Sequence, residues 1–275
     1  MDIRCIALDL DRTTLRSDGT LSPANRAALA RAAAKGVHVV IASGRAFATL
    51  PQAVLDVPGI EYAVTSNGAA VYHIPTARCL HRTLLRPGSV DRILALTVGE
   101  PVAYEGFVDG RAYAAADYVR DPEKYGAAPE AVAYVRRTRT LVEDMAGFLR
   151  AHRDCLDSLD VVTRDGADRE RIHAYLAAAD PDIYLTSSVR QLLEISHRDA
   201  GKHRGAAWIL AHLGIPREAL AAFGDGDNDA DLLAFAGCGI AMANASPACR
   251  AAADAVTASN DEDGVARGIT ELLGL

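Results

Sequence analysis

The chain has 275 residues, and 29 Lys and Arg against 36 Asp and Glu give it a formal net charge of −7. Half of the residues are hydrophobic and 5% are aromatic, which is the composition of a globular protein and not of a disordered or collagen-like one. The acidic balance argues against nucleic acid or an anionic membrane surface as the main partner. It does not exclude a small phosphorylated ligand, because the binding of such a ligand depends on the charge of its pocket and not on the net charge of the protein.

No stretch approaches 18 consecutive apolar residues, and the N-terminus reaches charged residues before any apolar segment could act as a signal peptide. We therefore expect no membrane span and a cytoplasmic location. The cysteine count is odd, and no two cysteines have the spacing of a redox pair or a metal site. Reduced and mostly buried thiols are expected.

The first elements alternate strand, helix and strand. Apolar runs at residues 4–8 and 37–42 predict buried strands, and Asp18-Gly19 predicts a hairpin turn between them. Ser22 and Pro23 are typical of a helix start, and Gly36 is typical of a helix end. This βαβ order predicts a parallel sheet.

The middle of the chain has a different pattern. A hairpin is expected around Asp109-Gly110, with further strands at 159–163, 183–186 and 191–195 and helices at 89–97, 140–152 and 168–178. This mixture predicts an α+β unit of residues 84–189, inserted into an α/β core formed by residues 1–83 and 190–275.

The C-terminal part returns to alternating strands and helices. A helix over 206–213 that ends at Gly214, a strand over 219–223, a short helix around Leu232 and a strand over 238–242 are expected. The last helix is predicted to bury one stripe of side chains, namely Val265, Ile269, Leu272 and Leu273.

Polar clusters follow three of the predicted parallel strands: residues 9–13 with Asp9 and Asp11, Ser43-Gly44-Arg45, and the acidic run 224–229. Open parallel sheets bind ligands at the carboxyl ends of their strands. Each cluster alone is also typical of a turn or helix cap, but three at successive strand ends predict a functional site.

These acids would concentrate negative charge in one crevice, which a cation would relieve. Oxygen ligands without a histidine and cysteine set favour Mg²⁺ over zinc. A calcium-binding loop in the run from Asp225 is excluded because its positions 6 and 12 are Ala230 and Ala236. With the charge neutralised, one aspartate could attack phosphorus and a second could transfer protons.

The order of these clusters, with Lys202 between the second and the third, resembles the haloacid dehalogenase superfamily of phosphotransferases. Within it, the chain is similar to the Cof-type sugar phosphatases, which carry a type IIB α+β cap. The supporting segments are 66–69 (Ser-Asn-Gly-Ala), 243–245 (Ala-Asn-Ala) and 259–265 (Ser-Asn-Asp-Glu-Asp-Gly-Val). The resemblance implies a Rossmann-like parallel-sheet core with an inserted cap that selects the substrate.

The resemblance also implies roles for the acids. Asp9 would be the nucleophile and a Mg²⁺ ligand, and Asp11 would be the general acid/base that also gives its backbone carbonyl to the metal. Asp225 would be the third protein ligand, and Asp229 would support the metal site from behind.

Phosphate binding is implied for a second set of residues. Ser43 and the Gly44 amide would hydrogen-bond the transferring phosphoryl group, and Lys202 would offset its charge. Asn228 would orient Lys202 or the phosphate. Thr13 is the hydroxyl typical of phosphatase members.

The chain departs from the family pattern at Arg12, where glycine is usual, and at Thr14, where leucine or valine is usual. Arg12 either reaches across the site mouth and biases substrate choice or points into solvent. Arg45 follows the phosphate-binding residues, so it either contacts substrate or forms a local salt bridge. The basic run Arg136, Arg137 and Arg139 is interpreted as a solvated face, and Trp208 is expected in the core.

The sequence thus predicts a Mg²⁺-dependent phosphomonoesterase that forms an aspartyl-phosphate and acts on small phosphorylated metabolites, above all sugar phosphates. Nucleotide and flavin-precursor phosphates stay open. The alternatives are a dedicated sucrose-phosphate or mannosylglycerate-phosphate phosphatase and a phosphate-binding regulatory module that has lost turnover. Monomer and homodimer are both compatible with the sequence.

Overall fold

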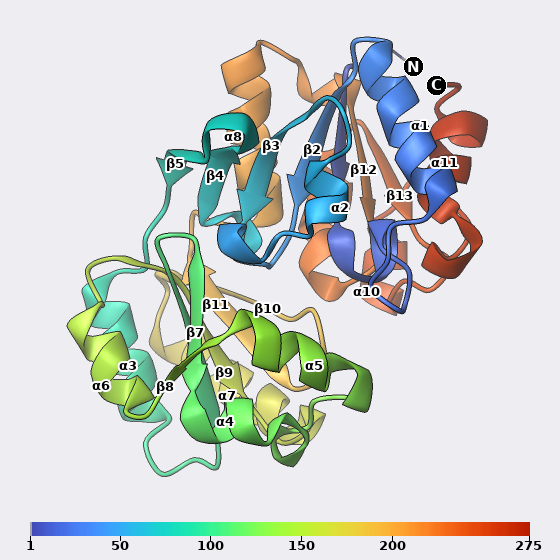
Figure 1. Ribbon diagram of the computed structural model, residues 1–275. Coiled ribbons are helices and arrows are strands. Elements are labelled where there is room, and N and C mark those ends of the chain that lie inside the picture. Colours follow the sequence, from blue (N-terminus) through green and yellow to red (C-terminus); the bar gives the residue numbers. More distant parts are fainter. Residues whose placement is uncertain (1) are drawn as a thin grey trace. The chain divides into compact units, whose positions relative to one another are not determined.

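The computed structural model describes residues 2–275, which form two compact units (Figure 1). The larger unit contains the residues through Arg45, Leu50–His81 and Gly201–Leu275. The smaller unit contains Ala46–Thr49 and Arg82–Ala200. Each unit has a sheet of its own.

The sheet of the larger unit has the strand order β14-β13-β12-β1-β2-β3-β4-β5. The pairs from β14 to β3 are parallel, and β4 runs antiparallel to β3. The strands are β1 Cys5–Leu8, β2 His38–Ala42, β3 Ile60–Thr65, β4 Ala70–His73, β5 Arg78–Arg82, β12 Leu220–Gly224, β13 Cys238–Ala241 and β14 Ala255–Val256.

The start of the first helix of this unit and the end of the helix before Gly214 lie where the sequence predicts them, but the latter helix begins at Lys202 and not at residue 206. The Ser22 hydroxyl accepts a hydrogen bond from the Asn25 amide (3.0 Å) at the start of the first helix, and Gly214, with a left-handed φ of 65°, ends α8. The helices are α1 Pro23–Ala34, α2 Gln52–Leu55, α8 Lys202–Leu213, α9 Ala230–Phe235, α10 Pro247–Ala251 and α11 Gly264–Arg267.

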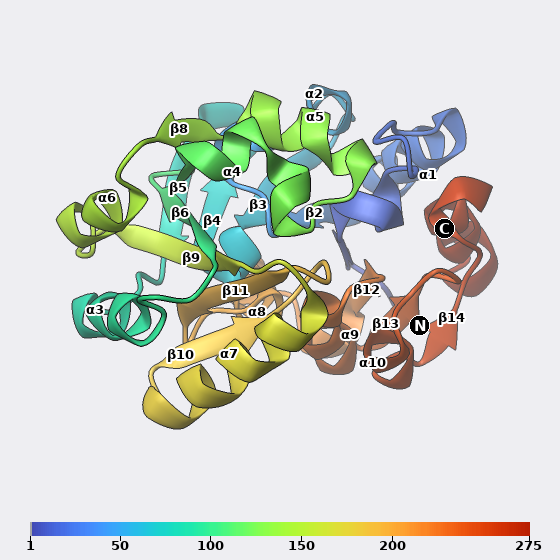
Figure 2. The ribbon, with the colours of Figure 1, turned by 90° about the horizontal axis from the view of Figure 1, so that it is seen from below.

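Helices cover both faces of the parallel strands. Cys5 and Ala7 of β1 belong to an apolar cluster with Ile209 of α8. The alternate residues Ile6 and Leu8 are equally buried, and α1 and α11 lie on that second face (Figure 2). Because both faces are apolar, polar side chains of these strands can gather only at the strand ends.

The sheet of the smaller unit has the order β10-β11-β9-β6-β7-β8. β10 with β11, β11 with β9, β9 with β6 and β6 with β7 pair antiparallel, whereas β7 and β8 pair parallel. The strands are β6 Ala103–Val108, β7 Arg111–Ala115, β8 Thr140–Val142, β9 Leu156–Val162, β10 Ile183–Thr186 and β11 Leu192–His197; the helices are α3 Pro87–Leu96, α4 Ala116–Arg120, α5 Pro129–Thr138, α6 Met145–Ala151 and α7 Gly166–Ala179.

Side chains alternate along the central strands of this sheet. Leu159 and Val161 of β9 join an apolar cluster with residues of α3, α6 and α7. Asp160, between them, pairs in register with Glu105 of β6 and with Glu194 of β11. Three buried carboxylates therefore stand side by side on the face opposite the apolar cluster.

The structure confirms the predicted fold class, a parallel α/β core with a separate α+β unit, and corrects details. Residues 190–200 belong to the smaller unit and not to the core, because β11 pairs with β9 and β10. The predicted helix over 140–152 begins only at Met145; Thr140–Val142 is the edge strand β8. Leu272, predicted to be buried, is 46% exposed.

Within residues 2–275, no helix combines the length and apolar character that a membrane crossing requires. The five cysteines are free, and Cys5, Cys238 and Cys249 are buried, as expected. Trp208 is only half-buried, and its ring stacks between those of His81 and His212 (centroids 5.4 and 5.1 Å away).

Candidate active site

Asp9 directly follows β1, where the chain enters a five-residue turn over Leu10–Thr14. The Leu15 amide donates to the Leu10 carbonyl (2.8 Å), and the Thr14 hydroxyl donates to the Asp9 carbonyl (2.6 Å). Arg12 has a left-handed φ of 60° in this turn, a conformation that favours glycine. The turn fixes the backbone of Asp9 at the carboxyl edge of the sheet.

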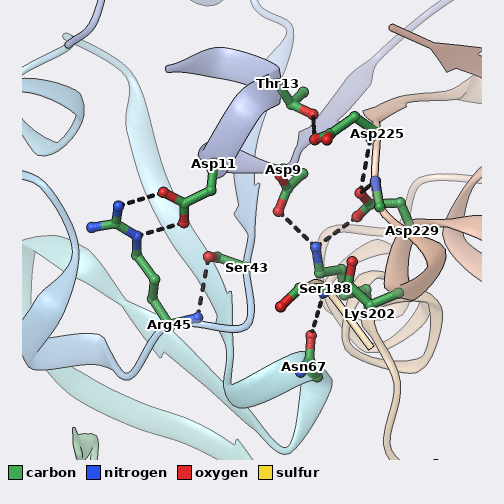
Figure 3. A network of polar contacts seen from close by, with 12 residues as sticks. Asp9, Asp11, Thr13, Ser43, Arg45, Asn67, Ser188, Lys202, Asp225 and Asp229 are labelled. Atoms are coloured by element: carbon green, nitrogen blue, oxygen red, sulfur yellow. Dashed lines mark hydrogen bonds and ion pairs between the residues drawn. The ribbon is translucent and has the colours of Figure 1, made fainter. Parts of the chain in front are cut away.

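Lys202 connects the first and third polar clusters (Figure 3). Its Nζ donates to Asp9 Oδ1 and to Asp229 Oδ1, both at 2.6 Å. The Lys202 side chain is 1% exposed, and those of the two aspartates are 9% and 1% exposed. Since water is largely excluded, these ion pairs interact more strongly than pairs on the surface.

Three further hydrogen bonds hold the third cluster. Asp229 Oδ2 accepts hydrogen bonds from the backbone amides of Asp225 (3.0 Å) and Gly226 (2.9 Å). Asp225 Oδ1 accepts one from the hydroxyl of Thr13 (2.7 Å). Thr13 therefore holds Asp225 in this structure, and its contact with phosphate stays a prediction.

Burial and the neighbouring charges shift the pKa values of Asp9, Asp225 and Lys202. Burial raises the pKa of Asp9 well above its usual range, although Lys202 opposes the rise. Burial, with the charge of Asp229, raises the pKa of Asp225 to about 7. Burial disfavours the charge of Lys202, but the carboxylates of Asp229 and Asp9 outweigh it and raise the lysine pKa.

This arrangement fits a divalent cation. One carboxylate oxygen each of Asp9, Asp225 and Asp229 lies within 4.8 Å of the others. An all-oxygen donor set suits Mg²⁺, and a cation would stabilise the charged carboxylates, whose pKa values are raised mainly by burial and also by their mutual repulsion. Both oxygens of Asp229 already accept hydrogen bonds, which agrees with a supporting role.

Asp11 lies apart from this carboxylate cluster. Its carboxylate is 55% exposed and accepts two hydrogen bonds from the guanidinium of Arg45, at 2.7 and 2.6 Å. Of the two interpretations of Arg45, the structure contains the local salt bridge. Any contact of Arg45 with a substrate stays a prediction.

Ser43 and Asn228 are both buried, and Figure 3 shows Ser43 beside Arg45. The Ser43 hydroxyl accepts a hydrogen bond from the Arg45 amide (3.2 Å). Asn228 Nδ2 donates to Asn67 Oδ1 (3.0 Å). Gly44 lies in the loop between Ser43 and Arg45.

The structure brings Asp9, Thr13, Lys202, Asp225 and Asp229 into one hydrogen-bonded network. Two residues that hold this site have no role predicted from the sequence. Thr14 departs from the family pattern, but no pattern indicates that its hydroxyl donates to the Asp9 carbonyl. Asn67 belongs to the family-like segment 66–69 without an assigned role.

Comparisons with known proteins agree with this geometry. The family of haloacid dehalogenase-like hydrolases matches residues 6–269. Phosphatase YwpJ of Bacillus subtilis is 31% identical over 98% of this chain and 100% of its own length. The 5-amino-6-(5-phospho-D-ribitylamino)uracil phosphatase YitU of the same organism is 28% identical over 98% of this chain and 97% of its own.

Solved structures agree in fold. A haloacid dehalogenase-like hydrolase from B. subtilis superposes with a TM-score of 0.86 and 27% identity, over 98% of this chain and 100% of that one. The subclass IIB sugar phosphatase BT4131 superposes with a TM-score of 0.82 at 22% identity, over 98% and 99% of the two chains. With its acidic cluster at the strand ends, this chain belongs to the haloacid dehalogenase-like hydrolases and is a hydrolase of the phosphatase type.

Proposed function

We propose that the protein is a Mg²⁺-dependent phosphomonoesterase that forms an aspartyl-phosphate on Asp9 and acts on small phosphorylated metabolites. The observation that carries the proposal is the position of Lys202, whose ammonium is 2.6 Å from both Asp9 and Asp229 in a buried site. Phosphoryl transfer depends on such fixed positive charge beside the nucleophile and the transferring group.

In this proposal Lys202 engages Oδ1 of Asp9, and the second carboxylate oxygen attacks phosphorus. The new bond joins that oxygen to phosphorus, and the bond between phosphorus and the ester oxygen breaks. The carboxyl of Asp11 gives its proton to the leaving oxygen. Water then attacks phosphorus, returns a proton to Asp11 and releases inorganic phosphate from Asp9.

The metal would be held by the carboxylates of Asp9 and Asp225 and by the backbone carbonyl of Asp11. When bound, it would neutralise these carboxylates and the charge of the phosphate. Ser43, the Gly44 amide, Lys202 and Asn228 would bind the phosphoryl oxygens.

Sugar phosphates are the proposed substrate class, which the likeness in fold to a subclass IIB sugar phosphatase supports. A second candidate is a phosphorylated ribityl compound. Three B. subtilis relatives, at 28%, 27% and 25% identity, are named as phosphatases of 5-amino-6-(5-phospho-D-ribitylamino)uracil.

The test is release of inorganic phosphate from a panel of sugar, ribityl, nucleotide and cofactor phosphates, with Mg²⁺ and with EDTA. Metal-dependent release is expected, and its rank order identifies the substrate class. A folded protein that binds Mg²⁺ and phosphate but releases nothing from any member would contradict the proposal and favour the regulatory alternative.

The nucleophile is tested by Asp9→Asn, which should lower turnover by at least about 10³-fold because the amide cannot form the acyl phosphate. Asp227→Asn is the matched control, since Asp227 is exposed and its carboxylate accepts a hydrogen bond from the hydroxyl of Ser246. Comparable activity in both variants would contradict the assignment of Asp9.

A further inference from the structure

The turn after β3 carries unusual backbone strain. Ser66, Asn67 and Gly68 have successive positive φ values of 48°, 51° and 94°. Two adjacent non-glycine residues in this region are costly, although asparagine tolerates it better than most. Such strain persists only where the surroundings determine the conformation. The Ser66 hydroxyl does not do so, because it is buried and has no hydrogen-bond partner within residues 2–275.

Backbone contacts to two other segments hold the turn. The Ser66 amide donates to the Arg45 carbonyl (3.0 Å), and the Asn67 amide donates to the Ser43 carbonyl (3.2 Å). Gly68 packs directly on Gly201, since a Cβ on Gly68 would lie 2.0 Å from the Gly201 carbonyl oxygen. Gly201 immediately precedes Lys202 at the start of α8.

A side-chain contact reaches the third segment. Asn67 is 5% exposed, and its Oδ1 accepts the hydrogen bond from Asn228 Nδ2 at 3.0 Å. That bond fixes which end of the Asn228 amide faces the turn. The Oδ1 of Asn228 lies on the other side, against Gly226, where a Cβ would be 2.5 Å away from it.

The turn thus meets three segments that carry the proposed phosphate-binding groups Ser43, Lys202 and Asn228. Figure 3 shows Asn67 on the side of the network opposite to Thr13 and Asp225. We propose that Asn67 is a positioning residue, whose amide sets the orientation of Asn228 and whose left-handed backbone locks the loop of Ser43 against the start of α8. The inference rests on the proposed phosphatase function and assigns Asn67 a role within the same site.

The decisive variant is Asn67→Gly, because glycine adopts the left-handed conformation without strain and removes only the amide. We expect kcat to fall about 5- to 20-fold and the Kd for inorganic phosphate in the presence of Mg²⁺ to rise about fivefold. The melting temperature should not fall, since relief of strain offsets the lost hydrogen bond. An unchanged kcat together with an unchanged Kd would overturn the proposal.

Two variants separate positioning from a purely structural role. Asn67→Asp keeps an acceptor for Asn228 Nδ2, so kcat should stay within about threefold of wild type. Its KM should rise, since the new negative charge repels the phosphate. Ala77→Gly is the matched control, because Ala77 is exposed in the same unit with a left-handed φ of 51°; it should raise stability without changing kinetics.

A double-mutant cycle tests the coupling directly. If Asn67 acts through Asn228, the double variant Asn67→Gly with Asn228→Ala should lose little more kcat and phosphate affinity than Asn67→Gly alone. Full additivity of the two losses would overturn the proposal. Phosphate binding is measured by calorimetry without turnover, so a wild-type enzyme that binds phosphate but hydrolyses nothing contradicts the proposed function and leaves this cycle measurable.

Discussion

Both units bury one cation among several carboxylates, but they place it differently. In the larger unit, Lys202 lies between Asp9 and Asp229 at the strand ends. In the smaller unit, Arg139 donates to Glu105 (2.7 and 3.0 Å), which pairs in register with Asp160. Asp160 pairs in turn with Glu194, and these carboxylates lie in mid-strand. A parallel sheet covered on both faces admits charge only at its ends, whereas a sheet with one apolar face admits it along the strands.

The two clusters also differ in how their negative charge is offset. The pKa of Asp160 is raised well above its usual range by burial and by Glu194 and Glu105, against the effect of Arg139. Protonation of Asp160, which its raised pKa favours, would remove its negative charge without a second cation. The acids at the strand ends of the larger unit instead form the cluster that suits a metal.

The largest effect is expected from Lys202→Met, which leaves two buried carboxylates without their cation. Breaking a buried pair in this way costs about 3–5 kcal/mol, and activity should be lost as well. Trp208, the one tryptophan, lies on α8 of the larger unit, so its fluorescence during urea unfolding measures the loss. Lys35→Met, at an exposed position, is the matched control; equal stability losses in both variants would contradict the role of Lys202.

Arg139→Met should destabilise the smaller unit by about 3 kcal/mol, since Glu105 is fully buried. Hydrogen exchange of the β6 and β9 amides reports this loss. The double variant Glu105→Gln with Arg139→Met should recover most of it, because no unpaired charge remains. Arg137→Met, on the exposed neighbour, should be neutral. No recovery in the double variant would show that the arginine acts by packing on the Phe107 and Tyr134 rings.

A pH-dependent effect is expected from Asp157, whose pKa is raised by burial to about 6 from 3.8, although Arg82 opposes the rise. The folded state therefore binds the proton more tightly than the unfolded state. This contribution to stability is complete below about pH 4 and is lost as the pH rises through 6.

Relative to Asp157→Asn, the wild type should lose about 2 kcal/mol of unfolding free energy between pH 4 and pH 7. Urea unfolding followed by circular dichroism at several pH values measures the difference. Asp109→Asn removes an exposed carboxylate that contacts the same Arg82 but keeps Asp157, so this variant should lose stability over the same pH range as the wild type. A difference that is constant with pH would contradict the shift at Asp157.

The smallest changes in unfolding free energy are expected from substitutions of two helix caps, one in each unit. Ser22 caps α1 in the larger unit, and Asp165 caps α7 in the smaller one through the amides of Ala167 and Asp168. Each substitution by alanine should cost about 1 kcal/mol. Trp208 fluorescence should detect the first loss more strongly than the second. Equal responses of this probe would mean that the two units unfold as one.

The strand ends and helix caps of the larger unit could be predicted because local residues determine them. Ser22, Pro23 and Gly214 act within one helical turn, and the apolar run before Asp9 needs no partner to be recognised. The crevice shared by Asp9, Asp225 and Asp229 could be predicted from their positions at strand ends, whereas the place of Lys202 in it required the family resemblance. The hydrogen bonds of Lys202 to Asp9 and Asp229 show that these residues lie close together, while their catalytic roles remain proposals.

What escaped prediction depends on contacts distant in sequence. Thr140–Val142 is a strand only because it pairs with β7, which outweighs the helical pattern that follows it. The sequence predicts a solvated face for the basic run Arg136, Arg137 and Arg139. The Arg139 side chain is nevertheless only 8% exposed, because it forms an ion pair with the buried Glu105. The left-handed turn at Ser66–Gly68 likewise follows from contacts with Ser43 and Gly201.

The pairing of β1 with β12 has a consequence for biosynthesis. Cys5 of β1 pairs in register with Leu220 of β12. The ribosome must therefore synthesise most of the chain before this central strand of the larger sheet can pair with β12. The smaller unit ends at Ala200, and all its strands have been translated by then. On the ribosome, we expect the inserted unit to fold first, while the chain segments that hold Asp9 and Ser43 stay incomplete until β12 emerges.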